Sequence, residues 1–213
     1  MSPDRRITVL ISGNGSNLQA LIDKAGTPDL PSITIVKVIS NRVKAYGRER
    51  ARNAGISEEY HNLVKYKKDL YPGDEKAARE HYDADLAQMV IRDKPDLVVC
   101  AGWMHILAPT FLLPLEQAQI PVINLHPALP GKFNGSHAIH RAYEAFQKGE
   151  IQETGIMVHY VIKEVDEGTP IKVEKISMIK DEPEENLENR IHQAEWKLIV
   201  EGTRMALDRL QKQ

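Results

Sequence analysis

The sequence is poor in three features that each mark a class of protein. Its 213 residues include one cysteine, Cys100, which excludes an internal disulfide and suits a reducing compartment. The net charge of −2 argues against general nucleic-acid binding, because such binding needs a cationic surface to neutralise phosphates. No apolar run approaches the roughly 18–20 residues of a membrane span, and the N-terminus shows no secretion-signal pattern. We therefore expect a cytoplasmic protein that binds neither nucleic acid nor membrane.

The common motifs of covalent and metal-assisted catalysis are also missing. The chain contains no HExxH or CxxC pattern, and no serine or cysteine nucleophile stands near a plausible base. Cys100 lies in the strand-like run DLVVCAGW, which favours a buried, inert thiol. His137 and His140 have the spacing of two ligands on one helix face, but no third ligand accompanies them. We therefore expect no metal site.

What the sequence does contain is an alternation of short β-branched runs with helical patterns. Strands are predicted at 7–12, 33–40, 58–62, 96–101 and 121–125. Helices are predicted from residue 17 onward, at 45–55, and at 75–93 before Pro95. Because the strands are apolar on both faces, this alternation indicates a parallel sheet that helices cover on each side.

The last third of the chain follows a different pattern. Two strands, 154–162 and 169–178, are joined by a connection too short for a parallel crossover, so they must pair as a hairpin. Residues 181–210 predict one long C-terminal helix, whose acidic first turn and Pro183 suit a helix N-terminus. Because no linker, repeat or low-complexity tract interrupts the sequence, we expect a single domain over residues 1–213.

The segment SGNGSNLQ (12–19) joins the first strand to the first helix. Its two glycines allow a tight turn and a close approach to a ligand, while Ser16 and Asn17 can cap the helix or donate to an anion. A dinucleotide motif needs a third glycine where this chain has Leu18, and a Walker A loop needs Gly-Lys-Ser/Thr. A monophosphate or phosphosugar fits best, and a purely structural turn is the alternative.

Asn124 and His126 stand two residues apart where a predicted parallel strand ends. Residues with this spacing on an extended segment point the same way, and open parallel sheets bind ligands beyond the strand C-termini. The following HPALPG stops both helix and strand. An asparagine amide can donate to an oxygen that gains negative charge, and a histidine can donate or transfer a proton. The alternative is a capping amide beside a buried structural histidine.

Asp166 is a third polar candidate, in the loop between the two late strands. Glu164 and Glu167 flank it, and spacing alone does not choose among the three. An acid here, combined with Asn124 and His126, favours acyl chemistry by polarisation and proton transfer, without a covalent intermediate or a metal.

At these residues the sequence resembles the folate-dependent formyltransferases. The motifs that carry the resemblance run in family order from about residue 7 to 200: ISGNGSNLQALID, AGWMHIL, INLHPALPG, TGIMVHYVIKEVDEGTPI and IHQAEWKLIV. The resemblance implies one α/β domain with a mostly parallel, doubly wound (Rossmann-like) sheet of about seven strands, the sixth antiparallel, and a long C-terminal helix. It further implies metal-free transfer of a formyl group from 10-formyltetrahydrofolate to the amine of 5-phosphoribosylglycinamide, in purine biosynthesis.

The resemblance also implies roles for individual residues. The implied catalytic residues are Asn124, His126 and Asp166. The implied substrate-binding residues are Gly13, Asn14, Gly15, Ser16, Asn17, His192 and Glu195. The implied folate-binding residues are Arg79, Met104, His105, Ile106, Leu107, Ile162, Lys163, Glu164 and Val165. This chain departs from the family in the loop ALPGKFNGS, in His105 where arginine is frequent, and in His192 where glutamine is frequent.

Two other functions are alternatives at this stage. One is a 10-formyltetrahydrofolate hydrolase that uses the same three residues, and the other is a non-catalytic phosphosugar-binding domain. The predicted phosphate loop favours the transferase over the hydrolase, because a hydrolase needs no phosphosugar.

Overall fold

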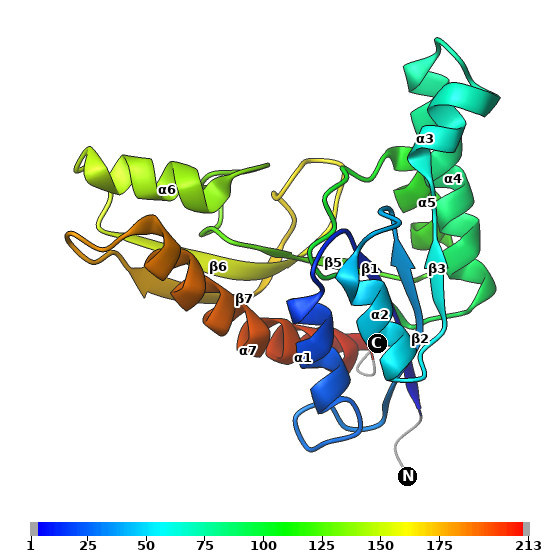
Figure 1. Cartoon of the computed structure of the whole chain (residues 1–213). Coiled ribbons are helices and arrows are strands. Elements are labelled where there is room, and N and C mark those ends of the chain that lie inside the picture. Colours follow the sequence, from blue (N-terminus) through cyan, green and yellow to red (C-terminus); the bar gives the residue numbers. More distant parts are fainter. Residues whose placement is uncertain (1–3, 211–213) are drawn as a thin grey trace. The chain divides into compact units, whose positions relative to one another are not determined.

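A computed structural model describes residues 4–210 of the chain (Figure 1). The chain forms two compact units, Met1–Val122 and Ile123–Gln213, called here the first and the second unit. The boundary falls inside the fifth strand. The prediction of a single domain over residues 1–213 stays a prediction.

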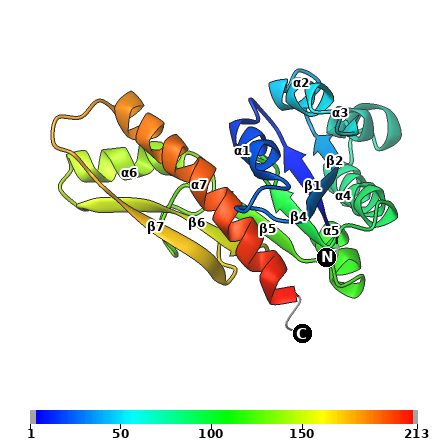
Figure 2. The same ribbon diagram turned by 90° about the horizontal axis from the view of Figure 1, so that it is seen from below.

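The first unit is a parallel sheet with helices on both faces. Its strands are β1 (Arg5–Ile11), β2 (Ile33–Ser40), β3 (Glu58–Tyr60) and β4 (Leu97–Cys100), which pair in the order β3-β2-β1-β4. Its helical segments are α1 (Ser16–Lys24), α2 (Tyr46–Asn53), α3 (Leu63–Lys65), the π-helical turn η1 (Tyr66–Leu70), α4 (Glu75–Arg92) and α5 (Pro109–Gln117). Helices α1 and α2 cover one face of the sheet, and α4 and α5 pack together on the other (Figure 2).

Strands β1 and β4 are the most deeply buried strands of this unit. Every residue of β1 except Arg6 is buried, and β4 is buried throughout. Cys100 ends β4 with 2% of its surface exposed, and burial raises the pKa of its thiol to about 12. The predicted burial of this thiol is therefore confirmed, and its raised pKa favours the protonated, unreactive form.

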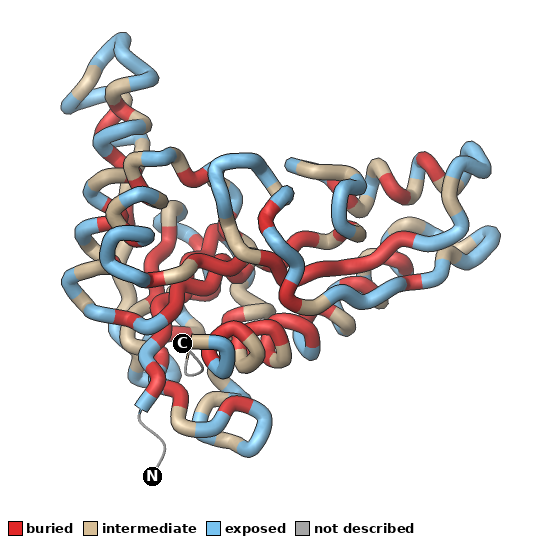
Figure 3. Tube along the Cα trace, turned by 180° about the vertical axis from the view of Figure 1, so that it is seen from behind, coloured by how far each residue is buried: buried red, intermediate tan, exposed pale blue. Residues whose placement is uncertain are grey.

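The second unit contains β5 (Val122–His126), α6 (Ala138–Gln147), β6 (Glu153–Tyr160), β7 (Pro170–Ser177) and the long helix α7 (Glu184–Leu210). Strand β6 is antiparallel to both β5 and β7. Almost all of β6 is buried, whereas most of β7 is exposed (Figure 3). Helix α7 packs on β6 and β7, and it approaches closely at Gly202, where a Cβ would lie 2.7 Å from Cβ of Val158.

Most of the predicted elements are confirmed. Residues 4–210 contain seven strands, the hairpin of the last third forms, the sixth strand is antiparallel to its neighbours, and one long helix follows the acidic turn. Helix α1 begins at Ser16 rather than Asn17, and its N-cap is Gly15 with no side-chain cap bond, so of the two roles open to Ser16 and Asn17 helix capping is not the one observed.

Helices α5 and α6 were not predicted, nor were the short segments α3 and η1. Helix α5 contains Pro114, and a proline inside a segment normally predicts the end of a helix. Helix α6 follows His137, which is left-handed with φ 56° and makes no side-chain cap bond, so no start signal precedes it. Within residues 4–210, no helix has the length and apolar character that crossing a membrane requires.

Candidate active site

Strand β5 ends with two polar side chains that point the same way. Asn124 and His126 are separated by one residue, and strand alternation puts them on one face. Their antiparallel partners on β6 are His159 and Met157 respectively. Strand pairing therefore brings His159 next to Asn124, although the two residues are 35 positions apart in sequence.

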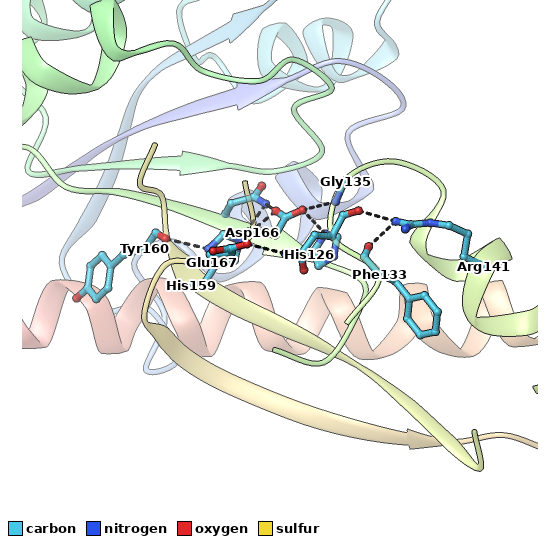
Figure 4. Close-up of polar contacts among 10 residues, drawn as sticks. His126, Phe133, Gly135, Arg141, His159, Tyr160, Asp166 and Glu167 are labelled. Atoms are coloured by element: carbon cyan, nitrogen blue, oxygen red, sulfur yellow. Dashed lines mark hydrogen bonds and ion pairs between the residues drawn. The ribbon is translucent and has the colours of Figure 1, made fainter. Parts of the chain in front are cut away.

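Asp166 reaches both β5 side chains from the loop between β6 and β7 (Figure 4). Its Oδ2 lies 3.3 Å from Nδ1 of His126, and its Oδ1 lies 3.4 Å from Nδ2 of Asn124. The backbone N–H of Gly135 donates to Oδ2 at 2.8 Å. Asp166 has φ 58°, a left-handed conformation that is rare outside glycine and is concentrated at functional sites. The three residues predicted to act together thus converge in the second unit.

His159 adds a fourth member to this cluster. Its Nδ1 lies 2.9 Å from the carbonyl oxygen of Tyr160 and therefore carries a proton (Figure 4). Its Nε2 lies 3.3 Å from Nδ2 of Asn124 and 3.5 Å from Oδ1 of Asp166. Nε2 accepts from the amide when the ring is neutral, and the ring pairs with the carboxylate when it is protonated.

The electrostatics of the cluster favour a neutral imidazole beside a carboxylate. Burial lowers the pKa of His126, and the attraction of Asp166, which raises it, is the smaller effect. Burial by itself raises the pKa of Asp166, but the contacts with His159, the Gly135 N–H and His126 outweigh it, so that pKa is lowered. With Nδ1 directed at the carboxylate, Nε2 of His126 is buried and has no hydrogen-bond partner within residues 4–210. An imidazole in this state can accept a proton at Nε2.

The loop that supplies the Gly135 N–H is tied to helix α6 by Arg141. Nη2 of Arg141 donates to the carbonyl oxygens of Phe133 at 2.6 Å and Asn134 at 2.7 Å (Figure 4). Asn134 also donates to Oε1 of Glu167 at 3.5 Å. The segment after His126, where this chain departs from the family, is thus a loop held at Phe133, Asn134 and Gly135.

The predicted phosphate loop lies in the first unit, between β1 and α1. Its residues are Gly13, Asn14, Gly15, Ser16 and Asn17. Gly15 has φ 77°, and a Cβ there would lie 2.6 Å from Cα of Gly47, so both conformation and space require glycine.

Helix α2 holds the carbonyl groups of this loop. The Gly47 N–H donates to the carbonyl of Gly13 at 3.1 Å, and Nε of Arg50 donates to that of Asn14 at 2.9 Å. Arg50 also donates to Oδ1 of Asn14 at 3.0 Å. Because its carbonyls face α2, the loop can present N–H groups to an anion, as the predicted role requires.

The predicted folate-binding segment 104–107, also in the first unit, is held by side chains of α4. Nη2 of Arg79 donates to the carbonyl of Ile106 at 2.7 Å. The carboxylate of Asp83, fully buried, accepts from Nε2 of His105 at 3.0 Å and from the N–H of Ala108 at 2.9 Å. The His105 side chain therefore turns into the protein rather than outward.

Apolar side chains are nevertheless exposed at the predicted folate positions of both units. Met104 and Ile106 are exposed by 75% and 60%, whereas Leu107 is buried. In the second unit, the loop residues Ile162, Lys163, Glu164 and Val165 are all exposed. Exposed apolar side chains on a loop are available to an aromatic ligand.

The two predicted substrate residues on α7 differ in burial. Glu195 is buried, with 7% of its surface exposed, and His192, one turn earlier, is exposed. The described part of the chain holds no cluster of three or more histidine, cysteine or acidic side chains arranged for a metal ion. His140 is paired with Glu184 at 2.9 Å, not with His137.

Sequence reasoning missed Gly135, Arg141 and Arg50. Arginines directed at backbone carbonyls give no local sequence signal. The pairing of His159 with Asn124 follows from the register of β5 on β6, which the predicted hairpin alone does not give.

Comparisons with known proteins agree with this arrangement. The family model described as Formyl transferase matches residues 5–203. Phosphoribosylglycinamide formyltransferase of Schizosaccharomyces pombe is 52% identical over 197 residues, which cover 92% of this chain and 94% of that protein. The enzyme of the same name from Saccharomyces cerevisiae is 46% identical, with 97% and 99% coverage.

Solved structures show the same likeness. The crystal structure of phosphoribosylglycinamide formyltransferase from Streptococcus pneumoniae TIGR4 matches with TM-score 0.79 and 30% identity, over 95% of this chain and 99% of that one. Glycinamide ribonucleotide transformylase 1 from Geobacillus kaustophilus matches with TM-score 0.80 and 32% identity, over 95% and 98%. With a family model that spans almost the whole described chain and close relatives that share its full length, the chain belongs to the formyl transferase family.

Proposed function

We propose that this protein transfers a formyl group from 10-formyltetrahydrofolate to the amine of 5-phosphoribosylglycinamide, a step of purine biosynthesis. Membership of the formyl transferase family supports the reaction class, and the phosphoribosylglycinamide formyltransferases at 46–52% identity support this acceptor. The observation that carries the proposal is the convergence of Asn124, His126 and Asp166, with Nε2 of His126 left to accept a proton.

The first step is attack of the amine nitrogen on the formyl carbon. A carbon–nitrogen bond forms, and the carbonyl π electrons move to the oxygen, giving a tetrahedral oxyanion. Asn124 is proposed to donate to this oxygen, in exchange for one of its two long bonds to His159 and Asp166. A single donor of this kind typically stabilises the transition state by about 3–4 kcal/mol.

The second step removes a proton from the attacking nitrogen and delivers one to the leaving nitrogen of the folate. His126 is proposed to accept the first proton at Nε2, because its lowered pKa keeps the imidazole neutral beforehand. The resulting imidazolium is stabilised by the carboxylate of Asp166, 3.3 Å from Nδ1, and can donate to the oxyanion. The carbon–N10 bond then breaks as the proton is passed on, giving the formylated amine and tetrahydrofolate without a covalent enzyme intermediate.

Binding roles are proposed for the remaining predicted residues. In the first unit, residues 13–17 bind the substrate phosphate, while Arg79 and residues 104–107 contact the folate; His105 contributes through its backbone. In the second unit, residues 162–165 contact the folate, and His192 and Glu195 contact the ribose region. The folate is a formyl donor consumed in each turnover, and no metal takes part in the proposed steps.

The test follows loss of formyl from a chromophoric 10-formyl folate, with and without 5-phosphoribosylglycinamide. The proposal expects loss that depends on the amine and matches the amount of formylated product. Loss without the amine would identify a hydrolase instead. Binding of both ligands with no loss would identify a non-catalytic binding domain.

A further inference from the structure

The guanidinium of Arg141 makes hydrogen bonds to backbone carbonyls rather than an ion pair with an acid. Its Nη2 donates to two consecutive carbonyl oxygens, those of Phe133 and Asn134, at 2.6 and 2.7 Å. Its guanidinium carbon also lies 5.9 Å from the centre of the Phe133 ring. Within residues 4–210, no carboxylate lies within ion-pair distance of Arg141. An arginine without an acidic partner, held against two carbonyls, fixes the course of a loop.

The two carbonyls can converge on Arg141 because the loop backbone is left-handed there. Phe133 has φ 48° and Gly135 has φ 83°. The left-handed region is rare for an aromatic residue, and such conformations persist when surrounding contacts hold them. Arg141 supplies those contacts from the first turn of α6 (Figure 4).

Peptide planarity then connects Arg141 to the proposed catalytic carboxylate. The carbonyl of Asn134 and the N–H of Gly135 belong to one planar trans peptide, in which they point in opposite directions. Arg141 holds the carbonyl on one side, and Oδ2 of Asp166 accepts from the N–H at 2.8 Å on the other. Fixing the carbonyl therefore fixes the N–H, and a cation on the carbonyl strengthens that N–H as a donor.

We propose that Arg141 is a positioning residue for the reaction. It acts through the Asn134–Gly135 peptide, whose N–H holds the carboxylate of Asp166 against His126 and favours its ionised form. This inference rests on the proposed function, because it assigns Arg141 to the group that handles protons in that reaction. Arg141 itself touches neither the substrate nor the reacting atoms.

The titratable groups around this centre allow the role of Arg141 to be tested through the pH dependence of activity. Asp166 faces His126 on β5, His159 on β6 and the Gly135 N–H, while His126 faces Asp166, His159, the Phe133 carbonyl and the charge of Arg141. Loss of Arg141 weakens the Gly135 bond, so the pKa of Asp166 rises, and it removes a positive charge, so the pKa of His126 rises. With both pKa values raised, Asp166 and His126 become protonated at a higher pH than in the wild type. The acid limb of the pH–activity profile therefore shifts to higher pH.

The experiment compares the full-length wild type with R141M and R141K across pH. R141M should lose roughly 10- to 100-fold in kcat, the range expected when a catalytic group is misplaced by up to about 1 Å, with a smaller change in KM for either substrate. Its acid limb should shift to higher pH. R141K should recover part of both losses, because its ammonium keeps the charge and can reach one carbonyl.

A matched control and a double-mutant cycle separate positioning from general destabilisation. Arg190, in the same unit, donates to Glu182 at 2.8 Å and to the Ser177 carbonyl, and R190M should leave kcat and the acid limb unchanged. If Arg141 acts through Asp166, adding R141M to D166N should cause little further loss of the residual kcat.

The wild-type assay distinguishes failure of this inference from failure of the proposed function. A wild type without amine-dependent formyl transfer would refute the function itself. With an active wild type, a normal kcat in R141M would overturn the inference, and so would a lower kcat with an unshifted acid limb. Full additivity of R141M and D166N would overturn it as well.

Discussion

The amide of Asn124 already has both hydrogens engaged before any substrate binds. Its nitrogen donates to Asp166 at 3.4 Å and lies 3.3 Å from Nε2 of His159, both near the outer limit of hydrogen-bond length. Long bonds of this kind hold the amide in place, yet exchange easily for a stronger bond to an oxyanion. Residue-scale geometry thus supports a donor that is oriented in advance.

Replacement of Asn124 by alanine tests that donor. We expect N124A to lose at least about 100-fold in kcat, because one oxyanion donor is removed, while the affinity for the substrate phosphate changes little. Steady-state kinetics and calorimetric binding of 5-phosphoribosylglycinamide provide the two readouts. N186A, at an exposed asparagine of α7, is the matched control. Turnover within a few-fold of wild type would remove Asn124 from the proposed role.

The pKa of His126 should respond to Asp166 with a defined sign. Burial lowers this pKa, and the Asp166 carboxylate partly offsets that effect, so D166N should lower it further. An NMR titration of the imidazole carbons measures the change. His140 is the internal control, because its pKa is raised by hydrogen bonding to Glu184 and should not move. A His126 pKa that stays constant or rises in D166N would contradict the assignment.

At the scale of elements, two helices support loops that themselves have no regular structure. Helix α6 holds the loop that reaches Asp166, and helix α2 holds the predicted phosphate loop. In both cases an arginine donates hydrogen bonds to carbonyl oxygens of the loop, so that N–H groups of the loop can point toward other partners. A loop built in this way keeps its shape because the helix behind it is rigid.

Arg50 allows a test of the α2 support. It donates to the backbone and side-chain oxygens of Asn14 and to Oε1 of Gln19, and R50M removes all three bonds. A hydrogen bond to a charged group contributes about 1.5–3 kcal/mol, and we expect loss of loop support equal to about one such bond, so that 5-phosphoribosylglycinamide binds about 10- to 100-fold more weakly. R52M, which removes an exposed arginine paired with Glu58, should bind as wild type does. Equal affinity of R50M and wild type for 5-phosphoribosylglycinamide would show that Arg50 does not support the phosphate loop.

At the scale of the whole molecule, the two units differ in architecture, and their unfolding can be followed separately. The first contains a parallel sheet with helices on both faces, and the second an antiparallel sheet with one long helix. The chain has two tryptophans, and each unit contains one. Trp103 is buried in the first unit, and Trp196 is 41% exposed on α7. Each unit therefore carries its own fluorescent reporter.

The predicted single domain requires both reporters to change together. We expect W103F and W196F, each with one remaining tryptophan, to show the same urea midpoint by fluorescence, because a single domain unfolds cooperatively. Circular dichroism of each variant corrects for any effect of the substitution on overall stability. Two midpoints that differ after this correction would show two domains that unfold separately.

What the sequence determined by itself was the set of strands, the longest helices and the candidate residues. Apolar periodicity, β-branched runs and the short connection at 163–168 are local signals, and they were enough for seven strands, a late hairpin and a long last helix. The same reading placed Asn124 and His126 on one face of a strand end, because strand alternation is also local.

Only the tertiary structure brought the acid and its supports together around them. Asp166 meets His126, whereas Glu167 contacts Asn134 and Glu164 is exposed, a choice that spacing could not make. His105 turns to a buried carboxylate rather than outward, and Arg141 reaches two carbonyls of a preceding loop. Side-chain directions in irregular segments depend on hydrogen bonds to residues far along the chain, and these exist only once the strands and helices have packed.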